Sequence, residues 1–165
     1  MKNTLGTAAI GASLLAAIAA PSAAFGGDGD VRWRKIVGIL DANNVVGGIL
    51  GSSQPRSALG GEARINLNDG TVEFEVRGLV QAGGNQVGTT LIAPLGIKGT
   101  IICRPGQSNE SVIDTPVVPL SPRGDAQFDG SFTSSTAGCS TTDIAFLIRN
   151  ALGGSWIANG AIRVP

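Results

Sequence analysis

Residues 62–78, EARINLNDGTVEFEVRG, constrain the fold of this chain more than any other stretch. Apolar and polar residues alternate on both sides of a central Asn-Asp-Gly, and a period of two places the apolar side chains on one face of a strand. Asn-Asp-Gly favours a tight turn. The stretch therefore predicts an antiparallel β-hairpin with one buried face and one hydrated face.

Two registers keep the apolar residues of this hairpin together, and charge distinguishes them. With Asp69-Gly70 as a two-residue turn, Glu62 faces Arg77 on the other strand. With the turn one residue earlier, at Asn68-Asp69, Glu62 faces Glu75 instead. The first register avoids a repulsion between like charges and puts a glycine where a positive φ is needed, so we predict it.

Further strands are expected between turns rich in glycine and proline. The candidate segments are 31–40, 45–50, 87–93, 97–103, 112–118, 126–133, 143–149 and 155–164. Because proline cannot donate to a strand ladder, Pro116 and Pro119 confine their segment to a sheet edge or an irregular run. Short strands at even spacing, with no helical stretch, predict an all-β antiparallel β-sandwich or small barrel of immunoglobulin-like or Greek-key type.

The first 24 residues have the order of a cleavable signal peptide. Lys2 is followed by an Ala-rich apolar run, Pro21 and small residues up to Ala24. The run is about a dozen residues long, short of the roughly 20 that span a bilayer. We expect cleavage after Ala24, a single domain at 25–165, no membrane span after cleavage, and a secreted or periplasmic location.

The charge balance excludes one class of partner. Without Lys2 the chain has 11 basic and 12 acidic residues, a net charge near −1. Nucleic acids and anionic membranes select clustered lysines and arginines, and this charge balance points to neither. We expect no nucleic-acid partner.

Cys103 and Cys139 are the two cysteines of the chain. An exported protein meets an oxidising compartment, and no CxxC spacing or histidine suggests a redox or metal site, so we predict a structural disulfide. In the chain-entropy model, a loop of this length gives a stabilisation of about 4 kcal/mol.

The chain has no histidine and no tyrosine. This composition excludes Ser-His-Asp and Cys-His machinery and the usual histidine-containing zinc and copper sites. The remaining candidates are Glu73 and Glu75, as a carboxylate pair, and a calcium-like run at 27–30. Lys35 and Lys98 fit outward-facing strand positions. We therefore predict no catalytic, cofactor-binding or metal-binding residue.

Two motifs and two tryptophans have plainer interpretations. Arg123-Gly124-Asp125 spells an adhesion tripeptide at an expected turn, and Asn109 begins an N-glycan acceptor sequence in an expected loop. Trp33 and Trp156 are expected to face the core, although the basic residues around Trp33 could also suit a sugar or polyanion.

The stretch GGEARINLNDGTVEFEVRGLV resembles the hairpin of chordin-type (CHRD) domains, in which a strand, a D-G turn, a second strand and a G-L step recur. The final WIANGAIRV resembles the same pattern more weakly. The resemblance implies an extracellular β-sandwich or barrel of poorly defined function, like those of secreted bacterial members. Many members carry a histidine-containing segment after the G-L step. This chain has VQAGGNQVGTTLIA there, so no functional residue is carried across.

These observations together predict an exported, noncatalytic β module with a structural or binding role at the cell envelope or outside the cell. An unknown protein or glycan at the cell surface is the expected ligand, and no cofactor is expected. One alternative is a carboxylate-dependent hydrolase that uses Glu73 and Glu75. Another is a self-assembling subunit of a fibre or surface layer, whose edge strands accept a neighbour through segments such as NNVVGGILGSS.

Overall fold

The computed structural model describes residues 28–90 and 96–164, so the expected signal peptide at 1–24 lies outside the described residues. Twelve strands and one short 3₁₀ segment make up the fold. Their bounds are β1 (Asp30–Gly38), β2 (Val45–Val46), β3 (Ile49–Leu50), β4 (Arg56–Ser57), β5 (Gly60–Asn66), β6 (Thr71–Arg77), β7 (Val80–Gln81), η1 (Gly84–Gln86), β8 (Ile97–Cys103), β9 (Ser111–Asp114), β10 (Ala126–Ser131), β11 (Ile144–Asn150) and β12 (Trp156–Val164).

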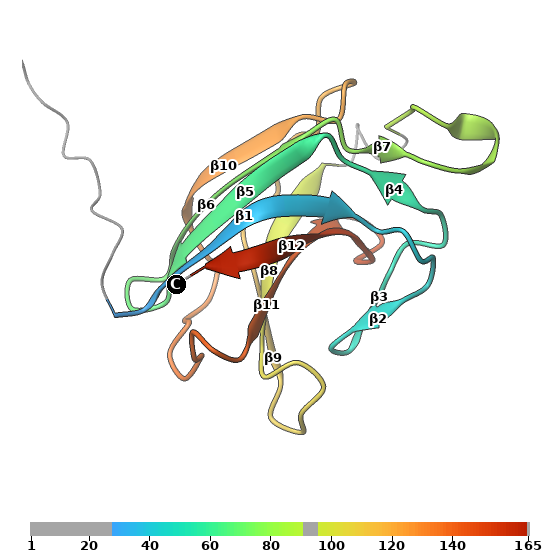
Figure 1. Cartoon of the computed structure of the whole chain (residues 1–165). Helices are drawn as coiled ribbons and strands as arrows, with labels where there is room; N and C mark the ends of the chain where they lie inside the picture. The colour runs from blue at the N-terminus through green and yellow to red at the C-terminus, as the bar shows by residue number, and fades with distance from the viewer. Residues whose placement is uncertain (1–27, 91–95, 165) are drawn as a thin grey trace, which may run out of the picture.

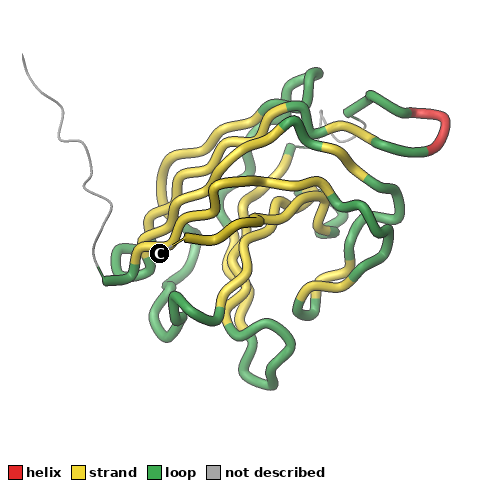
Figure 2. Tube along the Cα trace, viewed as in Figure 1, coloured by secondary structure: helices red, strands yellow, loops and turns green. Residues whose placement is uncertain are grey.

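Eight of the strands form one antiparallel sheet in the order β10-β6-β5-β1-β12-β11-β8-β9. The sheet curls into a half-barrel (Figure 1). The small pairs β2-β3 and β4-β7 lie together to one side of it (Figure 2). The all-β, antiparallel class predicted from the sequence is confirmed. No helix among the described residues is long and apolar enough to cross a membrane.

The β5-β6 hairpin forms as predicted, with Ala63, Ile65, Val72, Phe74 and Val76 buried. Its predicted register is wrong. Glu62 lies opposite Glu75, which is the arrangement that charge had disfavoured.

Two interactions that are not visible when only the pairing of the two strands is considered explain this register. Arg32 of the neighbouring strand β1 contacts the Glu62 carboxylate at 2.5 Å, and Arg64 contacts it at 3.4 Å, so the negative charge is compensated. At the turn, the Asn66 side-chain oxygen accepts hydrogen bonds from the backbone of Asn68 and Asp69, at 2.9 and 3.0 Å. This Asx turn fixes the loop one residue earlier than predicted.

Two other strand predictions need correction. Segment 45–50 is not one strand but the hairpin β2-β3, because Gly47 has a positive φ of 57° and lets the chain reverse. Segment 87–93 is not a strand over residues 87–90, where the 3₁₀ segment is followed by a turn. Residues 91–93 lie outside the described part. The short strands β4 and β7 were not predicted.

Aromatic side chains fill the concave side of the sheet. Phe146 of β11 lies 5.5 Å from Trp33 of β1 and 5.8 Å from Phe74 of β6, between ring centroids. The rings meet over Gly99 of β8, where a β-carbon would lie 2.7 Å from the Phe74 ring and 3.3 Å from the Phe146 ring. Glycine is needed there because strands from opposite ends of the sheet share one interior. Trp33 is thus a core residue, as predicted.

A second apolar cluster covers the convex side of β8 and β11. Ile102 and Leu147 are buried there against Ile39, Ile49 and Trp156. The Trp156 indole N–H donates to the Asn44 carbonyl at 3.0 Å, which ties the β2-β3 region to β12. Strand β8 is therefore buried on both faces, and Trp156 is also a core residue.

The predicted disulfide is confirmed. Cys103, at the end of β8, is bonded to Cys139 in the connection between β10 and β11, 36 residues later. Cys103 is buried in the main core, and Cys139 packs against it.

Replacing Gly99 with alanine should lower the free energy of unfolding by about 1–3 kcal/mol, because the added methyl overpacks the Phe74 and Phe146 rings. Urea titration measures the change. Gly153→Ala is the matched control, since a β-carbon there meets only the Asn150 side chain at 3.6 Å. Equal effects of the two substitutions would contradict this description of the interior.

Replacing both cysteines with serine should lower the free energy of unfolding by about 2–4 kcal/mol while the fold is retained, because the unfolded chain regains the freedom of a long loop. The measurement is denaturant unfolding of oxidised wild type and the double variant. A double variant as stable as wild type would show that the bond does not constrain the unfolded chain.

Candidate functional site

The charged face of the β5-β6 hairpin makes contacts within the sheet. Glu75 pairs with Arg77 at 3.6 Å, and Glu62 pairs with Arg32 and Arg64. The hydrogen bond from Arg32 lowers the pKa of Glu62, more than burial raises it, and the charges of Arg32 and Arg64 add to the effect.

The proposed carboxylate pair, Glu73 and Glu75, lines this face beside Gln127 of β10. The depression between them has a volume of only about 80 Å³. A glycosidase cleft must hold a sugar ring between its two carboxyl groups, and one of them needs a raised pKa. A depression of this size is smaller than the pockets that usually bind small ligands.

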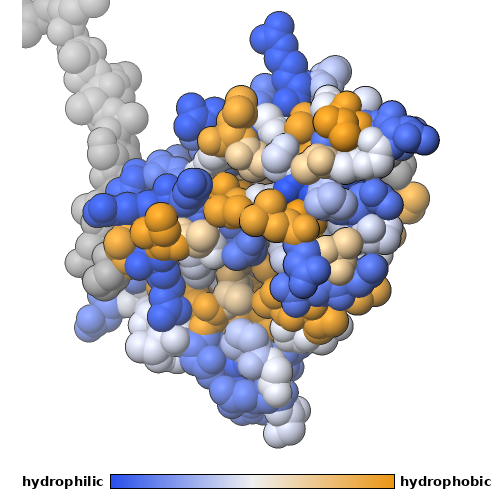
Figure 3. All heavy atoms as spheres, turned by 45° about the vertical axis from the view of Figure 1, so that its right-hand side comes forward, coloured by the Kyte–Doolittle hydropathy of each residue, from blue (hydrophilic) through white to orange (hydrophobic). Residues whose placement is uncertain are grey.

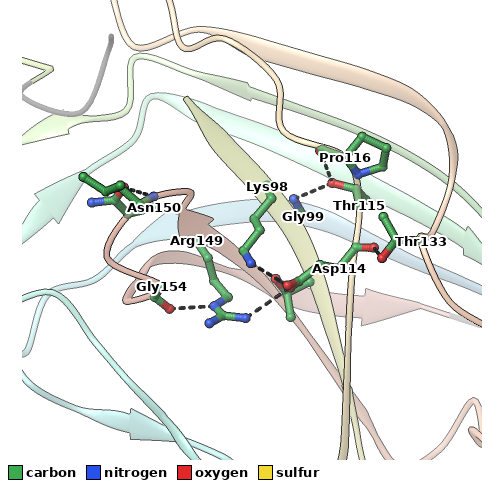
Figure 4. A network of polar contacts seen from close by, with 11 residues as sticks. Lys98, Gly99, Asp114, Thr115, Pro116, Thr133, Arg149, Asn150 and Gly154 are labelled. Carbon is green, nitrogen blue, oxygen red and sulfur yellow. Dashed lines mark hydrogen bonds and ion pairs between the residues drawn. The ribbon is translucent and has the colours of Figure 1, made fainter. Parts of the chain in front are cut away.

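The densest polar network lies on the convex side of the sheet around Asp114, the last residue of β9 (Figure 4). One carboxylate oxygen contacts Lys98 at 2.5 Å, and the other accepts from Thr100 at 2.6 Å and from Arg149 at 3.1 Å. Arg149 also donates to the Gly154 carbonyl at 2.6 Å. The cluster joins β8, β9 and β11 by charge-assisted bonds.

The backbone of Asp114 extends the network to the other end of the sheet. Thr133, just after β10, donates to the Asp114 carbonyl through both its N–H and its hydroxyl, each at 2.8 Å. These bonds bring the chain after one edge strand, β10, against the end of the other, β9 (Figure 4).

The electrostatics of the cluster favour ionised Asp114. Burial raises the pKa of Asp114, but the hydrogen bonds from Lys98 and Thr100 and the charges of Arg149 and Lys98 outweigh it, so the pKa lies below the usual range. A lysine that acts as a base must be neutral and beside a nucleophile. Lys98 is instead ion-paired, which suits a structural role, and Lys35 is exposed on β1.

The Arg123-Gly124-Asp125 tripeptide is part of a turn packed on the end of β6. The Asp125 carboxylate accepts from the Gly78 backbone at 2.9 Å and approaches the Ser121 hydroxyl at 3.4 Å. A β-carbon at Gly124 would lie 2.4 Å from the Leu79 backbone nitrogen. The turn thus explains Gly124 and Asp125, while Arg123 is exposed.

The glycan acceptor sequence lies in the loop between β8 and β9. Asn109 is exposed, and its carbonyl accepts from the Arg104 side chain at 2.9 Å. The neighbouring Glu110 accepts from the backbone of Gly48 at 2.8 Å and of Gly106 at 2.6 Å. This carboxylate anchors the tip of the β2-β3 hairpin to the loop.

Metal sites receive little support from the described residues. Nowhere in 28–90 and 96–164 do three His, Cys, Asp or Glu side chains gather as they would around an ion. Of the calcium-like run, Gly27 lies outside those ranges, and the Asp30 carboxylate accepts from the Asn66 side chain at 2.8 Å.

Two larger hollows have polar walls. One, of about 560 Å³, lies between the β5-β6 turn and residues 131–139, and Thr136 in its wall donates to the Leu67 carbonyl at 2.5 Å. The other, of about 520 Å³, lies beside the β4-β7 pair and is lined by Arg56 and Gln81. Both volumes are in the range of small-ligand sites.

Arg56 and Gln81 were not predicted from the sequence, because neither is in a predicted strand or a recognisable motif. Both are almost fully buried, at 7% and 4% exposure. The signal that could have drawn attention to Arg56 is an isolated basic residue after Gln54-Pro55, in a stretch with no nearby acidic residue.

No protein-family model, curated protein or solved structure shows a significant match to the chain. The resemblance of residues 60–80 to chordin-type domains therefore stays a hypothesis.

Replacing Asp114 with asparagine should lower the free energy of unfolding by about 1–3 kcal/mol at neutral pH, because Lys98 and Arg149 lose a half-buried partner. The folded-state pKa of Asp114 is depressed, so its contribution is full above the unfolded pKa of about 3.9 and is lost as pH falls through the folded value. The difference between wild type and variant should thus be constant above about pH 5 and shrink below about pH 4.

Urea unfolding at pH 3, 5 and 7 measures this difference, with the exposed Asp129→Asn of β10 as the matched control. A difference that is independent of pH, or that the control reproduces, would contradict the role given to Asp114.

Proposed function

We propose that this chain is an exported, noncatalytic β module with a binding role at the cell envelope or outside the cell. The observation that carries the proposal is the disulfide between Cys103 and Cys139, since such bonds persist in oxidising compartments. The Lys2-to-Ala24 leader pattern in the sequence supports the same location.

The polar side chains support a noncatalytic role. Glu62 on the β5-β6 face is paired with Arg32 and Arg64, and Asp114 is paired with Lys98 and Arg149. Catalytic groups are usually held with perturbed pKa values that suit proton transfer, such as a raised carboxyl pKa. The two carboxylates with shifted pKa values, Glu62 and Asp114, are shifted in the opposite direction.

Self-assembly is a second candidate, because the curled sheet keeps two edge strands, β9 and β10. An edge strand offers unpaired backbone groups to a neighbouring chain. The segment NNVVGGILGSS is less suited to this than its sequence suggested, since β2 and β3 pair with each other and Glu110 holds their turn. Light scattering coupled to size-exclusion chromatography distinguishes a binding module from a self-assembling subunit. Self-assembly requires oligomers whose size increases with protein concentration.

Processing of the leader is the most direct test of export. In a bacterial host, the full chain should be recovered outside the cytoplasm, beginning at Phe25 and with both cysteines blocked to alkylation. Ala24→Leu should block cleavage because signal peptidases require a small residue there, whereas Ala17→Leu in the apolar run should not. Full-length protein in the cytoplasm with two free thiols would overturn the proposal.

A further inference from the structure

Arg56 carries a buried charge without a protein counter-ion. Its Nε is shielded from solvent and has no hydrogen-bond partner, and no described carboxylate lies within ion-pair distance of its guanidinium. Burial lowers its pKa, as expected when nothing compensates the charge. A buried guanidinium normally sits against a carboxylate or another oxyanion, because an unpaired buried charge is unfavourable.

Gln81, beside Arg56, has a buried hydrogen-bond acceptor that receives no hydrogen bond. It is the cross-strand partner of Arg56 in the β4-β7 pair, so the two side chains are neighbours. The Gln81 amide nitrogen donates to the Gly83 carbonyl at 3.0 Å, which orients the amide, and its Oε1 is buried with no donor. A donor of Arg56 and an acceptor of Gln81 are thus both without a partner, in residues that line the same hollow.

The backbone holds both residues in place. The Arg56 N–H donates to the Ile39 carbonyl at 2.6 Å, where β4 crosses the end of β1. The Gln81 N–H donates to the Thr89 carbonyl at 2.9 Å, and its carbonyl accepts from Gly88 at 2.9 Å. Since both strands are anchored, the two side chains form a preorganised pair rather than a mobile surface.

The hollow beside this pair suits a hydroxylated ligand. It has a volume of about 520 Å³, and each described residue that lines it, apart from Gly84, has a polar side chain. Arg56 is the charged residue among them; the others supply hydroxyls from Ser52 and Ser53 and amides from glutamine and asparagine. Figure 3 turns this side of the molecule forward and shows hydrophilic side chains between separate apolar patches.

We propose that this hollow binds a sugar acid, with its carboxylate on Arg56 and a neighbouring hydroxyl donating to Gln81. One ligand can then supply both partners, because a sugar acid carries a carboxylate attached to one ring carbon and an O–H donor on the next ring carbon. Arginine matches the planar geometry of a carboxylate, and the surrounding hydroxyls and amides can bind the remaining ring hydroxyls. The inference rests on the binding role proposed above and names its ligand class.

The test is titration of the purified protein, followed by NMR of backbone amides and the Arg56 Nε–H. The probes are galacturonate, glucuronate and mannuronate, which differ in hydroxyl configuration. Their methyl esters remove the charge, and succinate removes the hydroxyls. At least one sugar acid should bind saturably with shifts centred on Arg56 and Gln81, and its ester and succinate should bind at least about tenfold more weakly.

Two variants locate the site. Arg56→Gln removes the donor, and Gln81→Glu supplies an internal carboxylate that occupies Arg56 without leaving a charge unpaired. Each should weaken sugar-acid binding at least about tenfold. Arg34→Gln, at an exposed arginine of β1, is the matched control and should bind as wild type does. If Arg56→Gln fails to fold, Gln81→Glu still decides the question.

Absence of saturable binding by all three sugar acids would overturn the inference. So would an ester or succinate that binds as tightly as the acid, or equal losses in Arg34→Gln and Gln81→Glu. None of these results bears on leader cleavage or on the disulfide, so failure here is distinguishable from failure of the export proposal.

Discussion

One curled sheet must fill its own concave side, and the rest of the structure depends on this constraint. The two ends of the sheet face one interior, so Phe74 of β6 and Phe146 of β11 meet over Gly99 of β8 although these strands lie far apart in the sheet order. A larger residue at position 99 would hold the ends apart. The convex side of β8 needs a separate cover, which Trp156 and the β2-β3 hairpin provide.

Ion pairs in this protein stabilise strand arrangements that the curled sheet requires. The register of β5 and β6 places two glutamates opposite each other, and Arg32 from a third strand makes that register tolerable. Asp114 fulfils a similar role, because its side chain ties three strands together and its carbonyl receives the chain from the opposite edge. Arg56 departs from this pattern, since its charge is buried without an internal partner. We assign a ligand to the hollow beside Arg56 because this charge has no partner among the described residues.

Local pattern predicted most of the long strands and the disulfide, since alternation and turn residues act within a few positions. The hairpin register failed because it depends on Arg32, which lies 30 residues from Glu62 in the sequence. Strands β4 and β7 are two residues long, too short for a period to be visible. The Arg56–Gln81 pair could not be predicted for the same reason: it arises from the pairing of two strands that leave no signal, and burial of an arginine runs against its usual preference.

Native-state hydrogen exchange tests most directly whether the curled sheet is one cooperative unit around one core. We expect the slowest amides of β5, β1, β12, β11 and β8 to share a single opening free energy equal to that of global unfolding, while the β2-β3 hairpin exchanges faster through local opening. Independent opening of the β10-β6-β5 half, with β11 and β8 still protected, would contradict a shared interior.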